Sequence, residues 1–556
     1  MPTWATWPVA AAEKIVLSYG ILERSVSISS LDTYARTGKI DSELAWYARH
    51  ASPQQLTQLQ QGLLTPIPLN SVEVSQFLYT SIGERLLGRL GEVIQMDSRQ
   101  PGFYAIRAAL IMAAADPEGF TPLTILRRFP STRIEINLAR SLEIANTLET
   151  LLNQSNRAFS LVEEQSSLEA STTPVSLPGE DLRQRGVLTW KKQAITLTDR
   201  TRDRRFPVDL YLPQSPKSHP IIVISHGLGS DLSSFTYLAE QLASHGFVVA
   251  VPEHPGSNTR QLQALLDGRA AEVTNPKEFI DRPLDIKFLL DELTRLAQAD
   301  PTLQGQLNLQ QVGVIGQSFG GYTVLALAGA PIRFQQLQTS CRALDDSLNL
   351  SLLLQCLALQ LPNRQYDLVD ARIKAAIAVD PIDSSVLGPE SLSQIKIPVM
   401  LVAGSADTVA PALPEQIQPF TWLTSINRYL VLIQNATHFS TIQPSSDDAV
   451  PIPPQVIGPN PALARRYLSA LGVAFFKTYV ANQASYRPYL SATYARAISQ
   501  EPLRLNLVRL LTEAQLAQVI GGSASPSLPA ETTPPAPSDS PQPVSPPPPP
   551  LSPLSQ

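Results

Sequence analysis

The pattern of apolar and polar residues changes twice along the chain. Up to about residue 164, apolar residues recur mainly at helical spacing; from about 187 to 482, short β-branched runs alternate with helical stretches; beyond Gly521, Pro and Ser dominate. Because each pattern is typical of a different architecture, we expect four segments. They are a mainly helical N-terminal domain at 1–164, a linker at 165–185, an α/β domain at 186–520 and a tail at 521–556.

The N-terminal region carries the start and stop signals of helices. Residues 52–55, Ser-Pro-Gln-Gln, form a capping box with Pro at the first helical position, and this helix is expected to end near Gly62. The alternating patterns at 26–28 and 134–138 predict two short extended pieces. A buried helix face is predicted from five apolar residues at helical spacing: Leu138, Leu142, Ala145, Leu148 and Leu152.

The α/β segment contains eight short apolar runs separated by helical stretches. Most of these runs are continuous rather than alternating, which is typical of strands that helices bury on both faces. Their rhythm predicts an α/β fold with an eight-stranded, mostly parallel, doubly wound sheet. The expected strands are Gln193–Thr198, Pro207–Leu212, Ile221–Ser225, Val248–Val251, Val312–Ile315, Ile373–Val379, Val399–Ala403 and Tyr429–Ile433.

The linker and the tail are recognised by composition. Residues 164–185 are rich in Ser, Thr, Pro and Glu, which predicts a surface linker. The tail includes the run Pro546–Pro550 among Ser, Thr and Ala. A segment of this composition cannot bury enough apolar surface to order itself, so we expect a disordered, polyproline-like extension.

Charge and composition exclude several classes of partner. The net charge is −5, charged residues make up 16% of the chain, and no run of five basic residues occurs. The chain therefore lacks the electrostatic pattern of proteins that bind nucleic acids or anionic lipid surfaces. It also lacks an apolar run of about 18 residues, so no membrane span is expected. Protein partners stay open.

The cysteines and the start of the chain leave the compartment open. Cys341 and Cys356 flank an apolar stretch; they form a disulfide if the protein is exported, or are two small core residues. Residues 9–12, Val-Ala-Ala-Ala, are similar to the end of a signal peptide, but no charged segment and no apolar core precede them. As written, the chain predicts a cytoplasmic protein, and a start upstream of Met1 predicts a periplasmic or secreted one.

The strongest chemical signal is a Gly-x-Ser-x-Gly pentapeptide between a predicted buried strand and a predicted helix. It consists of Gly316, Gln317, Ser318, Phe319 and Gly320. In this context the motif predicts a nucleophile elbow, a strained turn that exposes the Ser318 hydroxyl at the carboxyl edge of the sheet. Glycines at 316 and 320 let the strand and the helix approach each other without a Cβ clash.

A serine hydroxyl needs an adjacent base, and the base needs an orienting acid. His438 follows the last predicted strand and is the one histidine of six that comes after Ser318, as the order serine–acid–histidine requires. Asp407, after the seventh strand, is the favoured acid. Asp380, after the sixth strand, is the alternative, although both aspartates also suit helix capping. His226, as a base, would lie on the wrong side of Ser318.

Two backbone amides are needed to stabilise the oxyanion of a tetrahedral intermediate. The expected donors are the N–H groups of Phe319, directly after the nucleophile, and Leu228, in the loop after the third strand. His226 is expected to brace this loop. An insertion at 331–370, rich in Leu, either lines an apolar acyl pocket or packs against the core.

Several of these segments resemble known families. Residues 225–229, 242–250, 253–254 and 316–321 resemble the platelet-activating-factor acetylhydrolase branch of the α/β-hydrolases. That resemblance implies the nucleophile at Ser318, the oxyanion amides at Phe319 and Leu228, and the acid at Asp380.

Residues 404–411 and 436–439 are instead similar to cutinase-like polyesterases and to dienelactone-hydrolase-like bacterial proteins, which implies the acid at Asp407. True dienelactone hydrolases use a cysteine nucleophile, and Ser318 departs from that pattern. Residues 12–16 and 115–119 resemble a helical domain of unknown function that precedes such hydrolases in bacterial proteins.

Together, the motifs and the resemblance predict a serine ester hydrolase for lipid-like or other apolar acyl esters. Ser318 would attack the ester, His438 would move the proton and Asp407 would orient His438. This mechanism requires no metal and no organic cofactor. Two alternatives stay open: an acyltransferase with the same triad, and a non-catalytic binding protein on a hydrolase fold.

Overall fold

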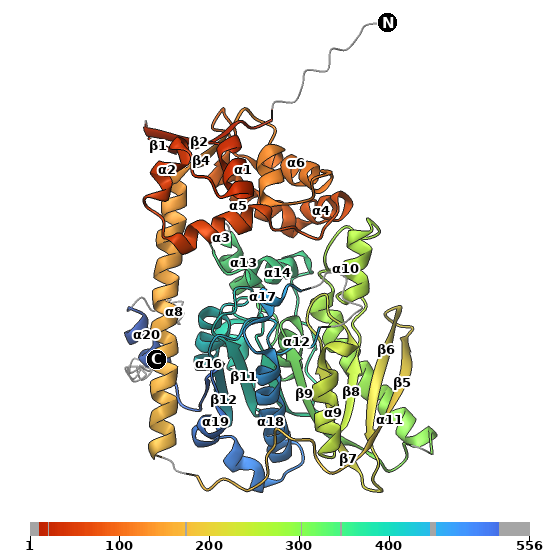
Figure 1. Ribbon diagram of the computed structural model, residues 1–556. Coiled ribbons are helices and arrows are strands. Elements are labelled where there is room, and N and C mark those ends of the chain that lie inside the picture. The colour runs from red at the N-terminus through yellow and green to blue at the C-terminus, as the bar shows by residue number, and fades with distance from the viewer. Residues whose placement is uncertain are drawn as a thin grey trace, which may run out of the picture.

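A computed structural model describes residues 11–521 except 21, 173–174, 302, 345–346 and 445–451. The predicted disordered tail and residues 9–10 of the signal-like segment lie outside the described residues. An N-terminal domain lies over one end of a larger α/β domain, and one long helix runs along the side of both (Figure 1). Within the described part of the chain, no helix combines the length and the hydropathy needed to cross a membrane.

The α/β domain is built on a nine-stranded sheet with the order β13-β12-β11-β10-β9-β7-β8-β6-β5. The six central strands of this order, from β12 to β8, are parallel to one another. The outer strands β5, β6 and β13 pair antiparallel with their neighbours. The bounds are β5 Trp190–Asp199, β6 Arg204–Pro213, β7 His219–Ser225, β8 Val248–Pro252, β9 Leu307–Gln317, β10 Ile373–Val379, β11 Val399–Gly404, β12 Arg428–Ile433 and β13 Leu505–Val508. The predicted α/β class is confirmed.

All eight predicted strands occur at their predicted places, but the predicted number is wrong by one. The ninth strand, β13, is only four residues long and lies far beyond the last predicted strand. It pairs with β12, placing Leu505 opposite Ile433. A short apolar run at an edge has too weak a pattern to be distinguished from a loop.

Helices bury both faces of this sheet in two separate apolar cores. Apolar side chains of α11, α12 and α16 pack on one face, and those of α9, α18 and α19 on the other. Continuous apolar strands such as β10 and β11 are explained by this burial on both sides. The helices of the domain are α9 Thr236–Ser244, α10 Thr259–Leu266, α11 Glu278–Ala299, α12 Phe319–Leu327, α13 Phe334–Arg342, α14 Ser351–Gln355, α15 Gly388–Leu392, α16 Gln418–Trp422, α17 Pro454–Ile457, α18 Pro461–Tyr479, α19 Ala492–Ile498 and α20 Glu513–Ile520.

The N-terminal domain packs seven helices against a small four-stranded sheet of order β2-β1-β4-β3. The capping box at Ser52 is present and starts α3. Two strands coincide with the predicted extended pieces, whereas β1 and β3 were not predicted. The bounds are β1 Lys14–Tyr19, β2 Leu22–Ser27, α1 Ile28–Thr37, α2 Ser42–Ala48, α3 Pro53–Leu64, α4 Ser71–Leu78, α5 Ser81–Val93, β3 Ile94–Gln95, α6 Phe103–Ala114, α7 Pro122–Arg127 and β4 Arg133–Asn137.

The long helix α8, Leu138–Thr172, corrects two predictions. It passes through the predicted boundary at 164, so residues 165–172 of the expected linker are helical. The predicted buried stripe is wrong as well, because Leu142 is 46% exposed and Leu152 is 54% exposed. Burial starts farther along α8, where Ala158 and Val162 pack into the core of the α/β domain. The helix joins two domains, and among the described residues the apolar stripe of its middle turns is left exposed.

The insertion at 331–370 lies between the α/β core and the N-terminal domain. Leu354 and Leu357 belong to the core of the α/β domain, whereas Leu352 and Leu353 pack with side chains of α5. A disulfide joins Cys341 on α13 to Cys356 directly after α14. A cavity of about 470 Å³ lies between this insertion and α5, and its lining includes Leu357 but none of the predicted catalytic residues.

The N-terminal domain contacts the loops that follow the carboxyl ends of the strands. The Ser81 backbone N–H at the start of α5 donates to Glu272, in the segment after β8, and the Ser81 hydroxyl donates to the same carboxylate. Arg89 of α5 donates to the carbonyl of Leu344 in the insertion. Because ligands of open α/β sheets bind at the carboxyl ends of the strands, this domain covers the edge at which a site is expected.

A substitution at Gly320 tests how closely the first turn of α12 packs against β7. A Cβ at Gly320 would lie 2.1 Å from the Ser225 carbonyl oxygen, so we expect Gly320→Ala to lower the free energy of unfolding by about 3 kcal/mol. Gly88 in α5 has no atom within 4 Å of a built Cβ and serves as the control. There the same substitution should stabilise the protein by about 1 kcal/mol, as measured by urea unfolding. Equal changes in the free energy of unfolding for Gly320→Ala and Gly88→Ala would show that the packing around Gly320 is looser than described.

Candidate active site

Ser318 lies at the turn between β9 and α12 and has the backbone angles φ 55° and ψ −116°. Such positive φ values strain a residue that has a side chain. A Cβ at Gly316 would meet the Gly320 carbonyl oxygen at 2.2 Å, and one at Gly320 would meet β7, so both positions exclude any larger residue. The structure therefore places Ser318 at the kind of turn that the pentapeptide predicts.

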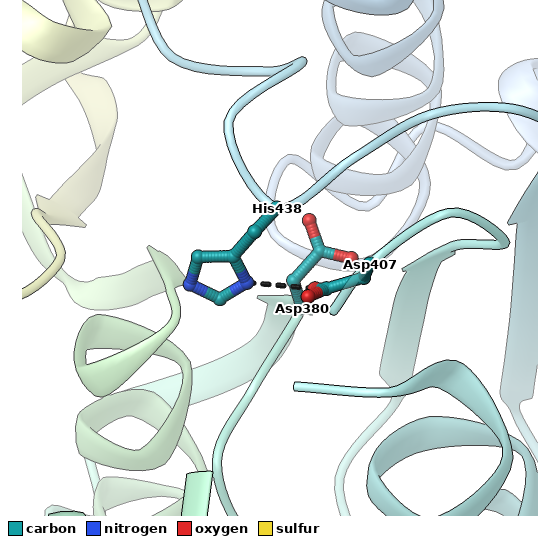
Figure 2. A group of neighbouring side chains, drawn as sticks. All are labelled: Asp380, Asp407 and His438. Carbon is teal, nitrogen blue, oxygen red and sulfur yellow. Dashed lines mark hydrogen bonds and ion pairs between the residues drawn. The ribbon is translucent and has the colours of Figure 1, made fainter. Parts of the chain in front are cut away.

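His438 lies in the loop after β12 and is paired with Asp407 (Figure 2). The distance from His438 Nδ1 to Asp407 Oδ2 is 2.7 Å, and both side chains are buried. The other carboxylate oxygen, Asp407 Oδ1, accepts the backbone N–H groups of Val409 and Ala410, each at 2.8 Å. These two bonds fix the carboxylate, which in turn fixes the imidazole ring.

The electrostatics of the pair favour a protonated imidazole. Burial alone would lower the pKa of His438, but the negative charge of Asp407 and its hydrogen bond outweigh burial, so the pKa is raised above its usual value. The ring edge of Phe439 packs against the imidazole, with centroids 5.4 Å apart. The imidazole thus has a charged partner on one side and an apolar one on another.

Asp380 lies beside this pair without replacing Asp407. Its Oδ1 accepts the Gly404 backbone N–H at 2.9 Å, and its backbone has φ 42°. Burial, and next the charge of Asp407, raise the pKa of Asp380 well above its usual value, so we assign it the neutral form and Asp407 the charge. Among the described residues, Asp380, Asp407 and His438 are the one group of His, Cys, Asp or Glu with ligand atoms close enough to hold a metal ion, all within 4.8 Å.

Gln317 connects the serine turn to the histidine loop. Its side-chain Nε2 donates to the His438 carbonyl oxygen at 3.1 Å. Between the described side chains of Ser318 and His438 themselves there is no hydrogen bond. Serine–histidine contacts in unliganded hydrolases are often long and tighten when a substrate binds.

The two predicted oxyanion amides are free to donate. Neither the Leu228 N–H nor the Phe319 N–H has an acceptor in the described part of the chain. The loop that carries Leu228 is fixed by its neighbours, because the Gly229 N–H donates to the Ser257 carbonyl at 2.8 Å. A Cβ at Gly227 would lie 2.4 Å from Gln317 Oε1, which keeps this loop close to the serine turn.

His226 is fully buried behind the loop, and its two ring nitrogens hydrogen-bond to the Gly227 carbonyl and the His254 N–H rather than to Ser318 or Asp407. The polar cluster that surrounds it is not predicted from the sequence. This cluster includes Arg282, Asp285 and His254, all fully buried. The missed signal was the spacing of Glu278, Arg282 and Asp285, which puts three charged residues on one face of a helix that packs against the sheet.

Two family models match separate parts of the chain. A model described as "Alpha/beta hydrolase of unknown function" matches residues 11–137, which lie in the N-terminal domain. A model described as "Platelet-activating factor acetylhydrolase, isoform II" matches residues 191–284, which include the Leu228 loop. The first description names an α/β hydrolase, and the second names the acetylhydrolase family that the sequence resembles.

Similar proteins occur among esterases of two kinds. A platelet-activating factor acetylhydrolase from Cavia porcellus is 28% identical over 147 residues, which cover 21% of this chain and 34% of that protein. Cutinase 2 from Thermobifida cellulosilytica is 24% identical over 289 residues, which cover 50% of this chain and 76% of the cutinase. Cutinase cut1 from Thermobifida fusca is also 24% identical, over 62% of its length. The matched regions thus span about a third of the acetylhydrolase and larger shares of the cutinases.

The charge on Asp407 can be tested through the titration of His438. We expect Asp407→Asn to lower the pKa of His438, because the substitution removes the attraction that outweighs burial. Asp380→Asn should lower it less, since the charge of Asp380 contributes least among the influences that raise the pKa of His438. NMR of imidazole-labelled protein as a function of pH measures both shifts, and a larger shift in Asp380→Asn would move the charge to Asp380.

Proposed function

We propose that the chain is a serine carboxylic-ester hydrolase of the α/β-hydrolase superfamily. The observation that carries the proposal is the strained Ser318 turn next to a buried imidazole–carboxylate pair. A serine in a relaxed βα turn would need neither feature. The cutinases and acetylhydrolases support the same reaction class, whereas the substrate and the residue roles are our inference.

In the proposed mechanism, His438 Nε2 takes the proton of the Ser318 hydroxyl while Ser318 Oγ attacks the ester carbonyl. Asp407 holds the proton on His438 Nδ1, which leaves Nε2 free to act as the base. The N–H groups of Leu228 and Phe319 donate to the oxyanion of the tetrahedral intermediate. His438 then protonates the leaving alcohol, and water, activated by the same imidazole, releases the acyl group as a carboxylic acid.

We propose apolar acyl esters as the substrate class. Leu228 and Phe439 are partly buried apolar residues of the loops that carry the oxyanion amide and the imidazole. Ser318 itself is only 6% exposed, so an ester that reacts there must approach a largely covered side chain rather than one on an open surface. Confinement of this kind favours apolar groups, which lose little by leaving water.

The role of Ser318 is tested by activity and by covalent labelling. Wild type should hydrolyse p-nitrophenyl esters, tested from acetyl to palmitoyl, and should react with a fluorophosphonate at Ser318. Ser318→Ala should lose the labelling and at least about 10³-fold in kcat, because the attacking oxygen is gone. Ser391→Ala, which removes another fully buried hydroxyl, is the control and should keep both. Labelling of a different serine in Ser318→Ala would refute the assignment.

The choice of the acid is tested by a pair of substitutions. Asp407→Asn should lower kcat/KM by about 10³- to 10⁴-fold, because the imidazole loses its charged, orienting partner. Asp380→Asn keeps a group of the same shape beside the pair and should cost about 10-fold or less. Steady-state kinetics of both variants decide the question, and the reverse order of losses would assign the role to Asp380.

The pH profile gives an independent measure of the base. A base must be neutral, so kcat/KM should fall as the pH drops through the raised pKa of His438, and this acidic limb should lie above the usual histidine range. Because Asp407→Asn removes the cause of the shift, its residual activity should have an acidic limb at lower pH. An acidic limb at the wild-type pH in Asp407→Asn would show that the rate does not follow the titration of His438.

A further inference from the structure

A cluster of fully buried polar groups lies directly behind the two proposed oxyanion amides. At its centre is Arg282 on α11, which has no exposed surface. Its guanidinium donates to Ser257 Oγ at 2.7 Å and to Thr323 Oγ1 at 3.1 Å, and it also donates to the His226 carbonyl oxygen. Moving a charged arginine from water into the protein interior has a large desolvation cost, which these hydrogen bonds offset.

Arg282 contacts both segments that carry the amides. On one side it holds the carbonyl of His226, two residues before Leu228. On the other side its guanidinium lies 4.8 Å from the centre of the Phe319 ring. Thr323, which accepts from Arg282 Nε, donates in turn to the Phe319 carbonyl oxygen at 2.8 Å. One rigid side chain thus links the loop after β7 to the first turn of α12.

A second serine–histidine–aspartate series supports the loop from below. Ser225 Oγ lies 3.0 Å from His254 Nε2, and His254 Nδ1 lies 3.0 Å from Asp285 Oδ2. Asp285 requires a proton on Nδ1, so the Ser225 hydroxyl donates to Nε2 and accepts from Arg282 at 3.3 Å. Since Ser225, His254 and Asp285 are fully buried, this series does not reach a substrate and is structural rather than nucleophilic.

The same logic fixes His226. Its Nε2 accepts the backbone N–H of His254 at 3.0 Å, so its proton is on Nδ1, which donates to the Gly227 carbonyl at 2.7 Å. Burial lowers the pKa of both His226 and His254 well below the usual value, in agreement with two neutral rings. The carbonyl oxygens of His226 and Gly227 thus accept from Arg282 and from the His226 ring. Neither of them is occupied by the following N–H group, that of Leu228.

The charge of Arg282 is balanced inside the protein. Burial lowers its pKa to about 9, and the nearby carboxylates Glu278 and Asp285 oppose this shift, so the guanidinium stays charged at neutral pH. Glu278 and Asp285 also pair with Arg204, at 2.7 Å in each case.

We propose that Arg282 is a positioning residue that sets the distance and angle between the Leu228 and Phe319 N–H groups. This inference rests on the proposed function. Two donors stabilise an oxyanion only if both point at the same place, and they come from segments 91 positions apart in sequence, 228 and 319. Arg282 contacts both segments, through the His226 carbonyl and through the Phe319 ring with Thr323.

The test compares Arg282→Lys and Ser225→Ala with a matched control. Lysine keeps the charge but cannot contact the His226 carbonyl, Ser257 and Thr323 in one plane. Ser225→Ala removes one bond of Arg282 and is the milder change, in case Arg282→Lys folds poorly. The control, Ser391→Ala, deletes a serine that is also fully buried, accepts from an arginine, Arg333, at 3.0 Å, and donates to a carbonyl at 2.6 Å.

Two rates separate positioning from mere stability. Fluorophosphonate labelling of Ser318 passes through an oxyanion and needs no known substrate; its second-order rate should fall about 100-fold in Arg282→Lys and about 10-fold in Ser225→Ala. With p-nitrophenyl esters the loss should lie in kcat, with KM within about twofold. Thionoesters, whose sulfur uses the amides poorly, should lose less, so the ratio of ester to thionoester rates should fall. Ser391→Ala should change none of these values by more than about twofold.

The outcomes distinguish this inference from the proposed function. If the variants label Ser318 at the wild-type rate, or lose no more than Ser391→Ala, Arg282 does not position the amides while the esterase assignment stands. If the ester and thionoester rates fall equally, the loss comes from general disruption, and the inference is also wrong. If wild type shows neither labelling at Ser318 nor ester hydrolysis, the proposed function fails and this inference fails with it.

Discussion

Close backbone packing at the β9–α12 turn constrains the rest of the candidate site. The turn holds Ser318 at φ 55°, and the helix that follows lies so close to β7 that a single methyl group at Gly320 would meet the Ser225 carbonyl. Strand β7 leads directly into the loop of Leu228, so the same contact fixes where this loop starts relative to Ser318. The proposed nucleophile and both proposed oxyanion amides thus share one rigid frame.

The second half of the site is held by hydrogen bonds from backbone N–H groups and from side chains. Asp407 is oriented by two N–H groups of its own loop, and His438 by Asp407 and by the side chain of Gln317. Asp380, at the end of the neighbouring strand β10, brings a second carboxyl group to the same place. Two carboxylates cannot both be charged at such short range in a buried site, which is the physical reason for assigning the charge to one of them.

The arrangement of the domains gives this buried site its surroundings. The N-terminal domain contacts the segment after β8 through Glu272 and the insertion through Leu344, and helix α8 runs down the side of the α/β domain (Figure 1). These contacts cover the carboxyl edge of the sheet.

The sequence by itself determined the α/β class, the place of eight strands and the residues of the Ser318 turn, because apolar runs and paired glycines are local signals. It also predicted Ser318, Asp407 and His438 in the order that the proposed role requires, with Asp380 as an alternative acid. Only the tertiary structure decided that Asp407 is the partner of His438, since the pairing depends on how two loops meet in space. The same holds for the exposed stripe of α8 and for Arg282, because burial is set by contacts between segments far apart in the chain.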